Sequence, residues 1–325
     1  MNDIADRYRL FAETEARGNS PCYEQWCLEI ADDAELLTLI GTLPEAKQQP
    51  NLVLGAARFV GATAGPYAAL REWLMVHWQA VRDVTLSRST QTNEVGRTAV
   101  LMPLLARLPG PLSLIEIGAS AGLCLYPDRF SYRYDDRPVI DPAAGPSEVI
   151  LTCATTGSPP IPDTLPHVVY RAGVDLNPLN VADPDDMRWL ESLIWPDQPQ
   201  RLARLRAAAT IARRHRPHLI AGDLNDAVAD AVASAPKDLT IVVFGSAVLA
   251  YLHASERSRF ARSISRLSCH WISNEGVGVM FSPDQLPTPA KSLSSGRFVV
   301  AVDGTPVALA APHGQTLDWL ERTVD

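Results

Sequence analysis

The stretch that decides the fold class is LIEIGASAGL, residues 114–123. Its first half is apolar except for Glu116, which is typical of a buried strand, and its second half consists mainly of small residues. Small residues allow backbone N–H groups to come close to a ligand, and the start of a helix adds partial positive charge. The stretch therefore predicts a strand followed by a ligand-binding turn at the beginning of an α/β domain.

Short β-branched runs alternate with helical patterns from residue 111 onward, which indicates a mainly parallel sheet with helices on both faces. The expected strands are 112–117, 167–174, 218–221, 239–244, 270–273, 297–302 and 306–310. Asp303 and Gly304 separate the last two strands and predict a hairpin, so this final pair should be antiparallel. Residues 131–166, which are rich in Pro, Gly and Thr from 135 onward, are expected to be an insertion with at most one strand.

Residues 1–110 show only helical periods, and the expected helices are 4–16, 20–41, 51–60, 66–84 and 93–108. Ser20 and Pro21 predict a helix start, because serine is a favoured N-cap and proline is favoured at the first helical position. We therefore expect an all-helical N-terminal domain over residues 1–110, followed by an α/β domain over residues 111–325.

Composition and charge limit the class of protein. The chain has 325 residues, of which 46% are hydrophobic and 20% charged, and its net charge is −8. This balance is typical of a globular protein and offers no basic field for nucleic acid or an anionic membrane. The five cysteines are scattered without metal-ligand spacing, so neither a zinc site nor a disulfide framework is expected. We expect a cytoplasmic protein with a small-molecule substrate and no metal.

Acidic residues follow three successive strands. Glu116 before spaced glycines resembles the first motif of enzymes that use S-adenosyl-L-methionine (SAM). Asp175 can accept both hydroxyls of a ribose, and Asp223 can face the adenine amine, although either could simply cap a helix. The cofactor-binding residues expected at these strand ends are Glu116, Gly118, Ala119, Ser120, Gly122, Asp175, Leu176, Asp223 and Leu224.

The strand 239–244 continues into FGSAVLAYL, residues 244–252, where methyltransferases place groups that face the methyl and its acceptor. Phe244, Gly245 and Ser246 complete the expected cofactor site. If the acceptor needs a base, the candidates are Tyr251, His253 and Glu275, and the sequence does not separate them.

A competing interpretation comes from GASAG, residues 118–122, because it also matches the G-x-S-x-G nucleophile elbow of α/β-hydrolases. Ser120 would be the nucleophile, Asp223 or Asp303 the acid and His313 the base. Against it, no His-Gly-Gly loop precedes the serine, and Pro127 falls early in the helix that should follow it.

Several longer strings resemble a bacterial family called domain of unknown function 2332. They include QTNEVGR at 91–97, EIGASAGL at 116–123, GVDLNPLNVADPDD at 173–186 and VVFGSAVLAYL at 242–252, and the resemblance covers about residue 20 to the end. It implies a SAM-methyltransferase-like fold and no established reaction.

The resemblance also draws attention to QTNEVGR, because in related folds this segment lies over the cofactor's carboxylate. Arg97 could pair with that carboxylate, with Gln91, Thr92 and Asn93 as hydrogen-bonding groups around it. Alternatively, Thr92 or Asn93 caps a helix and Arg97 pairs with Glu94 or a surface acid.

Together these patterns predict an α/β protein with a Rossmann-like SAM-methyltransferase sheet that ends in an antiparallel hairpin, behind an all-helical domain that selects the substrate. The expected function is a SAM-dependent methyltransferase acting on a small molecule. The alternatives are another SAM-consuming reaction such as cyclisation, hydrolysis through Ser120, or ligand binding without catalysis.

Overall fold

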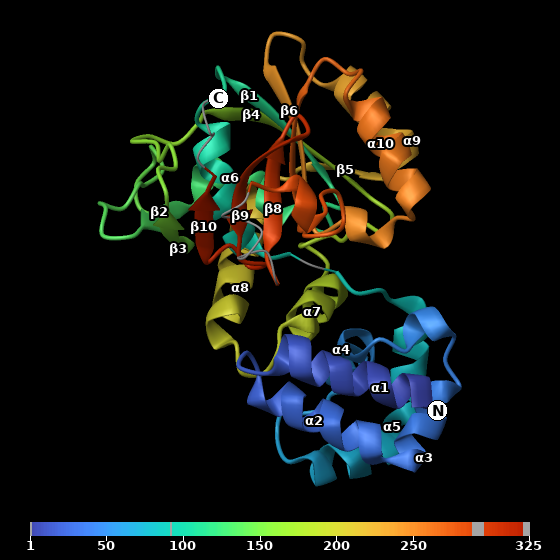
Figure 1. Ribbon diagram of the computed structural model, residues 1–325. Helices are drawn as coiled ribbons and strands as arrows, with labels where there is room; N and C mark the ends of the chain where they lie inside the picture. The colour runs from blue at the N-terminus through green and yellow to red at the C-terminus, as the bar shows by residue number, and fades with distance from the viewer. Residues whose placement is uncertain (1, 92, 288–295, 321–325) are drawn as a thin grey trace. The chain divides into compact units, whose positions relative to one another are not determined.

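The computed structural model describes residues 2–91, 93–287 and 296–320, and its chain divides into two compact units that interleave in sequence (Figure 1). The helical unit comprises Met1–Thr92 and Asn180–Ala203, and the sheet unit comprises Asn93–Leu179 and Arg204–Asp325. The expected boundary at residue 110 therefore differs from the observed one. Residues 93–110 join the sheet unit because the helix they contain is buried along its whole length.

The helical unit is built from amphipathic helices. They are α1 (Asn2–Phe11), α2 (Pro21–Asp32), α3 (Ala34–Gly41), α4 (Pro50–Val60), α5 (Tyr67–Ser87) and α7 (Pro184–Leu193). The predicted start at Ser20 is observed, because its hydroxyl accepts from the Tyr23 N–H at 3.2 Å. The expected single helix over 20–41 is wrong. Asp33 interrupts it, and its carboxylate accepts from the N–H groups of Glu35 and Leu36 at the start of α3.

Residues 180–203 belong to the helical unit because α7 packs against α4. A Cβ at Gly55 would lie 2.8 Å from the Leu193 side chain, so the two helices approach closely only because position 55 is glycine. Arg58 of α4 donates to the carbonyls of Ser192 and Ile194, which fixes the end of α7.

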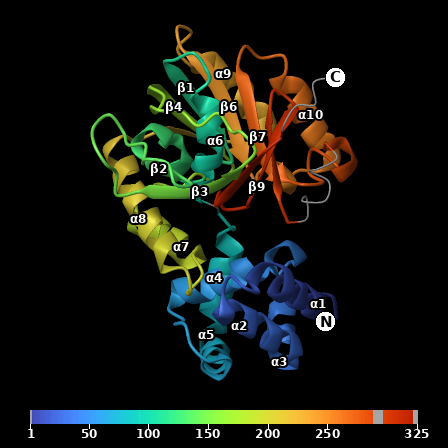
Figure 2. The ribbon, with the colours of Figure 1, turned by 60° about the vertical axis from the view of Figure 1, so that its left-hand side comes forward.

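The sheet unit contains ten strands in the described residues. They are β1 (Leu112–Ile117), β2 (Ser131–Tyr134), β3 (Ile150–Thr156), β4 (Val168–Asp175), β5 (His218–Ala221), β6 (Thr240–Ser246), β7 (His270–Gly276), β8 (Phe298–Val302), β9 (Thr305–Ala310) and β10 (Thr316–Trp319). Their order is β2-β3-β10-β9-β8-β7-β6-β1-β4-β5 (Figure 2). The strands β5-β4-β1-β6-β7 are parallel, and β7 to β10 form an antiparallel meander.

The expected hairpin is observed between β8 and β9, where Asp303 and Gly304 both have positive φ, 49° and 78°. The expectation of at most one strand in the insertion is wrong. Residues 131–166 contribute two strands, β2 and β3, and β3 pairs in parallel with β10, so this segment extends the sheet.

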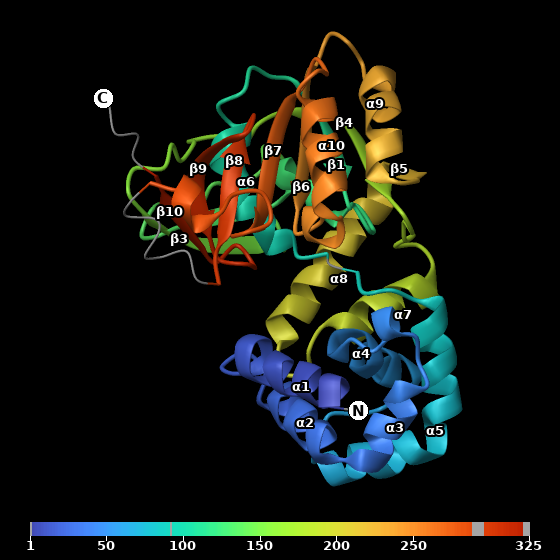
Figure 3. The ribbon, with the colours of Figure 1, turned by 45° about the vertical axis from the view of Figure 1, so that its right-hand side comes forward.

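The remaining helices are α6 (Thr98–Leu105), α8 (Pro199–Arg214), α9 (Leu224–Ser234) and α10 (Ala254–Ile264). Helices α9 and α10 contact each other and share a core with one face of β1, β6 and β7 (Figure 3). Ile115, Ile117, Val243 and Trp271 point into that core. Side chains alternate along a strand, so Glu116 lies on the opposite face of β1.

The order of the parallel strands reverses at β1. After β1 and the strands β2 and β3, the chain forms β4 and β5 on one side of β1 and then returns to β6 on the other side. Ligands of open α/β sheets bind at the carboxyl ends of the strands where the order reverses in this way. Here that place is the end of β1 between β4 and β6.

Among the helices of residues 2–91, 93–287 and 296–320, none combines the length and apolar character that a bilayer crossing requires.

Candidate functional site

The turn after β1 has an unusual backbone. Gly118, Ser120 and Gly122 all have positive φ, 68°, 51° and 69°. A Cβ at Gly118 would lie 2.5 Å from the Val248 side chain, so this turn packs directly against the loop that follows β6. The loops that follow β1 and β6 therefore pack against each other.

No α-helix follows this turn, in contrast to the helix start that the small residues predict. The chain instead forms two 3-10 turns, Leu123–Leu125 and Pro127–Arg129. Proline at the start of the second turn has no N–H for a continuing helix. The backbone at this turn therefore lacks the helix N-terminus that would attract a phosphate.

Asp175 is directed at the turn. Its Oδ2 accepts from the Ser120 N–H at 2.8 Å, and its Oδ1 accepts from the Asn177 N–H at 2.8 Å. It does not cap a helix, because the next helix begins at Pro184. The neighbouring Leu176 is 67% exposed. An acid and an exposed apolar side chain thus stand together at the end of β4.

The QTNEVGR segment contacts the same turn through Asn93. Its Nδ2 donates to the Ser120 hydroxyl at 2.6 Å, and its Oδ1 accepts from the Ala121 N–H at 3.1 Å. Thr92 lies outside the described residues, and Gln91 belongs to the helical unit. The side-chain carboxamide of Asn93 therefore links the QTNEVGR segment to the turn after β1.

Arg97 is 6% exposed and connects three parts of the sheet unit. Its Nε donates to the Pro312 carbonyl at 2.8 Å, and its Nη1 donates to the Ser246 carbonyl at 3.1 Å. Its guanidinium carbon lies 5.5 Å from the centre of the Phe298 ring. Arg97 therefore holds the loops after β6 and β9 as a structural cation.

Glu116 is buried on the opposite face of β1 from the α9–α10 core. Burial raises its pKa well above the usual value, and the nearby Asp175 raises the pKa further, while Cys124 and Arg97 act in the opposite direction. Its Oε2 is buried and has no hydrogen-bond partner among the described residues. This oxygen is an acceptor without a donor at the end of β1.

The raised pKa of Glu116 predicts a pH-dependent stability. The folded protein holds the proton of Glu116 more tightly than the unfolded chain does. The protonated side chain therefore adds to the free energy of unfolding below about pH 4.5, and this contribution is lost as the pH rises. We expect the free energy of unfolding of Glu116→Gln to fall less steeply than wild type between about pH 5 and pH 8, and to exceed it at the upper end. Urea titrations across this range test it, and identical slopes would contradict it.

The three expected bases occupy different environments. Tyr251 is 70% exposed, and His253 is exposed at the start of α10, where its N–H donates to the Glu256 carboxylate at 2.9 Å. Glu275 is buried, and its Oε1 accepts from the Val248 and Leu249 N–H groups at 3.0 and 3.1 Å. Burial raises the pKa of Glu275, while these N–H groups and Arg97 lower it. Glu275 thereby holds the loop after β6 in place.

Asp223 has the role of a helix cap. Its carboxylate accepts from the Asn225 N–H at 2.8 Å at the start of α9, and it lies 3.9 Å from Arg259. Leu224 and Phe244 are buried in the core. A Cβ at Gly245 would lie 2.6 Å from the Ile117 side chain, so glycine there allows β1 and β6 to pack closely.

The geometry does not support the hydrolase interpretation. Ser120 is buried, and its hydroxyl accepts from Asn93. Asp303 cannot complete a triad, because it lies beside His270 at the amino end of β7, whereas Ser120 lies at the carboxyl end of the parallel sheet. A strand of this length separates the two ends by about 20 Å. The turn also lacks the helix that supports a nucleophile elbow.

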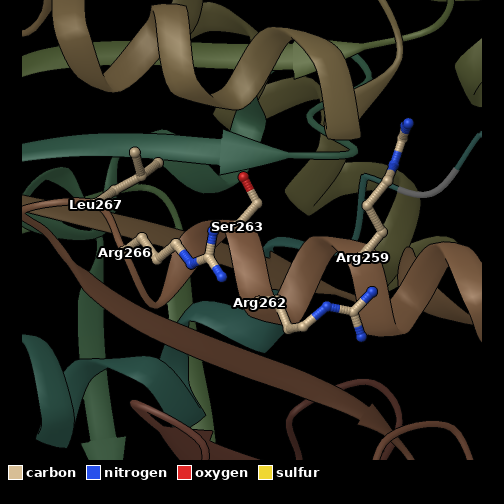
Figure 4. Close-up of a pocket in the computed structure, with 5 residues that line it drawn as sticks. All are labelled: Arg259, Arg262, Ser263, Arg266 and Leu267. Atoms are coloured by element: carbon tan, nitrogen blue, oxygen red, sulfur yellow. The ribbon is translucent and has the colours of Figure 1, made fainter.

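A surface hollow lies elsewhere, on α10 and the residues just after it. It is lined by Arg259, Arg262, Ser263, Arg266 and Leu267 (Figure 4). The three arginine side chains extend in different directions and do not converge on one point. Arg259 pairs with Asp226 at 3.2 Å, so part of this charge is already neutralised.

The sequence did not reveal the role of the turn between β9 and β10. A Cβ at Gly96 would lie 2.5 Å from the His313 carbonyl, so the turn lies directly on the segment that contains Glu94. Glu94 is 4% exposed; its Oε1 accepts from the Gly96 N–H at 3.0 Å and lies 3.7 Å from Nη2 of Arg204. Its Oε2 lies 3.7 Å from Nδ1 of His313. The glycines at 96 and 314 were the only local sign of this contact.

Comparison with known proteins identifies the family. No curated protein and no solved structure matches the chain. The family model for domain of unknown function 2332, described as an uncharacterized protein conserved in bacteria, matches residues 5–319. The protein therefore belongs to the bacterial family known as domain of unknown function 2332.

Proposed function

We propose that this protein binds SAM at the carboxyl ends of β1, β4 and β6 and transfers its methyl group to a small molecule. The observation that carries the proposal is the pairing of Asp175 with the first turn. The carboxylate bonds to the Ser120 N–H, while the adjacent Leu176 side chain is 67% exposed. A carboxylate there can accept ribose hydroxyls, and an exposed leucine offers an apolar surface to a base.

The charge at the turn favours SAM over a dinucleotide. A pyrophosphate is normally held at a helix N-terminus, and only a 3-10 turn follows Gly122. Glu116 instead offers a buried oxygen without a donor. A positively charged ligand group supplies both a donor and a compensating charge, because a buried carboxylate is stabilised by a nearby cation. SAM carries an ammonium and a sulfonium, whereas a pyrophosphate is anionic.

The residues of the chain would act mainly by positioning. Asn93 fixes the turn through Ser120 and Ala121, and Arg97 fixes the loop after β6. When bound, SAM supplies an electrophilic methyl group for an in-line displacement, a reaction in which orientation provides much of the rate. A site of this kind requires neither a metal nor a catalytic triad.

Leu176→Ser tests the proposal without disturbing the fold, because the side chain is exposed. We expect calorimetry with S-adenosylhomocysteine to show affinity about tenfold weaker than wild type, since roughly 1.4 kcal/mol of apolar contact is lost. Val169→Ser is the matched control, because Val169 is 52% exposed and lies at the opposite end of β4 from Leu176, and the affinity of this variant should be unchanged. Wild type that binds NAD but neither SAM nor S-adenosylhomocysteine would refute the proposal.

Product analysis separates methyl transfer from the alternatives. Methyl transfer releases S-adenosylhomocysteine, whereas intramolecular cyclisation releases methylthioadenosine. If Ser120 were a nucleophile, a fluorophosphonate would label it and Ser120→Ala would prevent the labelling. A protein that only binds the ligand would give none of these products.

A further inference from the structure

We propose that the hollow on α10 binds a small molecule that carries two or more phosphate groups. The hollow has a volume of about 400 Å³, which lies within the range of small-molecule sites. None of the five residues that line it belongs to the proposed SAM site, so the inference goes beyond the proposed function and does not depend on it.

The charge of α10 differs from that of the chain as a whole. Residues 254–267 contain four arginines and one acidic residue, Glu256, whereas the net charge of the chain is −8. Most of that negative charge belongs to the helical unit, where 17 acidic and 10 basic residues give −7. Positive charge is therefore concentrated at α10 in an otherwise acidic protein, which favours an anionic ligand there.

Two of the three arginines at the hollow are not neutralised by the protein. Arg259 pairs with Asp226 of the neighbouring α9 at 3.2 Å. Arg262 and Arg266 are exposed, and neither side chain has a hydrogen bond or an ion pair in the part of the chain that the structure describes. Like charges three or four residues apart on a helix repel each other. A bound anion would remove this repulsion.

The groups around the hollow are rich in hydrogen-bond donors. A guanidinium has five N–H donors and no acceptor, and Ser263 adds a hydroxyl to the three arginines. A matching ligand must be negatively charged and rich in acceptors. A phosphate group meets both conditions, because its oxygens accept paired hydrogen bonds from the fork of an arginine.

The placement of the arginines indicates more than one phosphate. Their side chains extend in different directions, so a single phosphate does not reach all three (Figure 4). Arg259 and Arg262 lie one turn apart on α10, and Arg266 follows just after the end of the helix. A short chain of phosphates can contact successive members of this row, and its affinity should rise with each added phosphate.

Calorimetry of the full chain with orthophosphate, pyrophosphate and tripolyphosphate tests the inference. We expect tripolyphosphate to bind at least tenfold more tightly than orthophosphate. Arg262→Gln and Arg266→Gln should each weaken the binding of tripolyphosphate about tenfold, because each removes hydrogen bonds to a charged group. Both side chains are exposed, so neither change should alter the fold.

Arg214→Gln is the matched control. Arg214 is also an exposed arginine in the last turn of a helix, α8, so the variant loses the same charge away from the hollow. We expect it to bind tripolyphosphate as the wild type does. In wild type, tripolyphosphate should protect Arg262 and Arg266 from modification by phenylglyoxal and leave Arg214 reactive, as read by peptide mass spectrometry.

Three results would overturn the inference. They are no binding of tripolyphosphate by the wild type, equal weakening in all three variants, and tighter binding of a single-stranded RNA of equal phosphate concentration, which would identify a macromolecular partner. The affinity for S-adenosylhomocysteine should be the same in Arg262→Gln as in wild type. Failure of the wild type to bind SAM would therefore refute the proposed function and leave this inference intact.

Discussion

Replacing Arg97 by methionine is expected to lower the free energy of unfolding by about 3–5 kcal/mol, because it removes one partner from a buried charged network. Arg97 is 6% exposed and lowers the pKa of both Glu116 and Glu275, which are themselves buried. The substitution also leaves the carbonyls of Pro312 and Ser246 without this donor. Methionine approximates the length of the side chain, so most of the loss reflects charge and hydrogen bonding.

Urea unfolding followed by tryptophan fluorescence measures this loss. Arg259→Met is the matched control, because Arg259 is 56% exposed and pairs with Asp226, and we expect it to cost less than about 1 kcal/mol. The loss in Arg97→Met should grow as the pH rises, because the pKa values of Glu116 and Glu275 rise further and ionising them then costs more. A loss no larger than that of the control would mean that Arg97 does not hold these loops.

Asp175→Ala is expected to weaken S-adenosylhomocysteine binding about 100-fold. Hydrogen bonds to a charged group contribute about 1.5–3 kcal/mol each, and loss of 2.7 kcal/mol corresponds to roughly this factor. The change also frees the Ser120 N–H from its present acceptor, so the turn after β1 loses a constraint. Calorimetry with the wild type and the variant measures the effect.

Asp135→Ala is the control for this change. Asp135 also accepts a backbone N–H from another segment, that of Thr155 at 2.8 Å, but it lies in the loop after β2. We expect this variant to lose some stability and to bind S-adenosylhomocysteine as the wild type does. Equal losses of affinity in the two variants would show that Asp175 acts only through the fold.

Local sequence determined where most elements begin and end. The helix start at Ser20 follows from a side chain that bonds three residues away, and the hairpin at Asp303 follows from two residues that tolerate positive φ. Strands β1 and β6 follow from mainly apolar runs, as expected of strands covered on both faces. Such features depend on neighbours along the chain, so a single sequence contains them.

Only part of the candidate site could be predicted from the sequence. Asp175 and Asp223 follow adjacent parallel strands in similar strings, yet Asp175 bonds to the Ser120 N–H while Asp223 caps α9. The difference depends on whether a helix starts directly after the strand. That in turn depends on the loop of residues 176–183, which the local pattern did not resolve.

Only the tertiary structure decided which distant segments meet. Residues 180–203 pack on α4, β3 pairs with β10, and His313 lies beside Glu94. Each contact joins segments far apart in the chain, and it depends on side chains and backbone that become neighbours only once the chain has folded. A linear pattern records the spacing of neighbours and not this complementarity, so the fold class could be predicted and the partners of Arg97 and Glu94 could not.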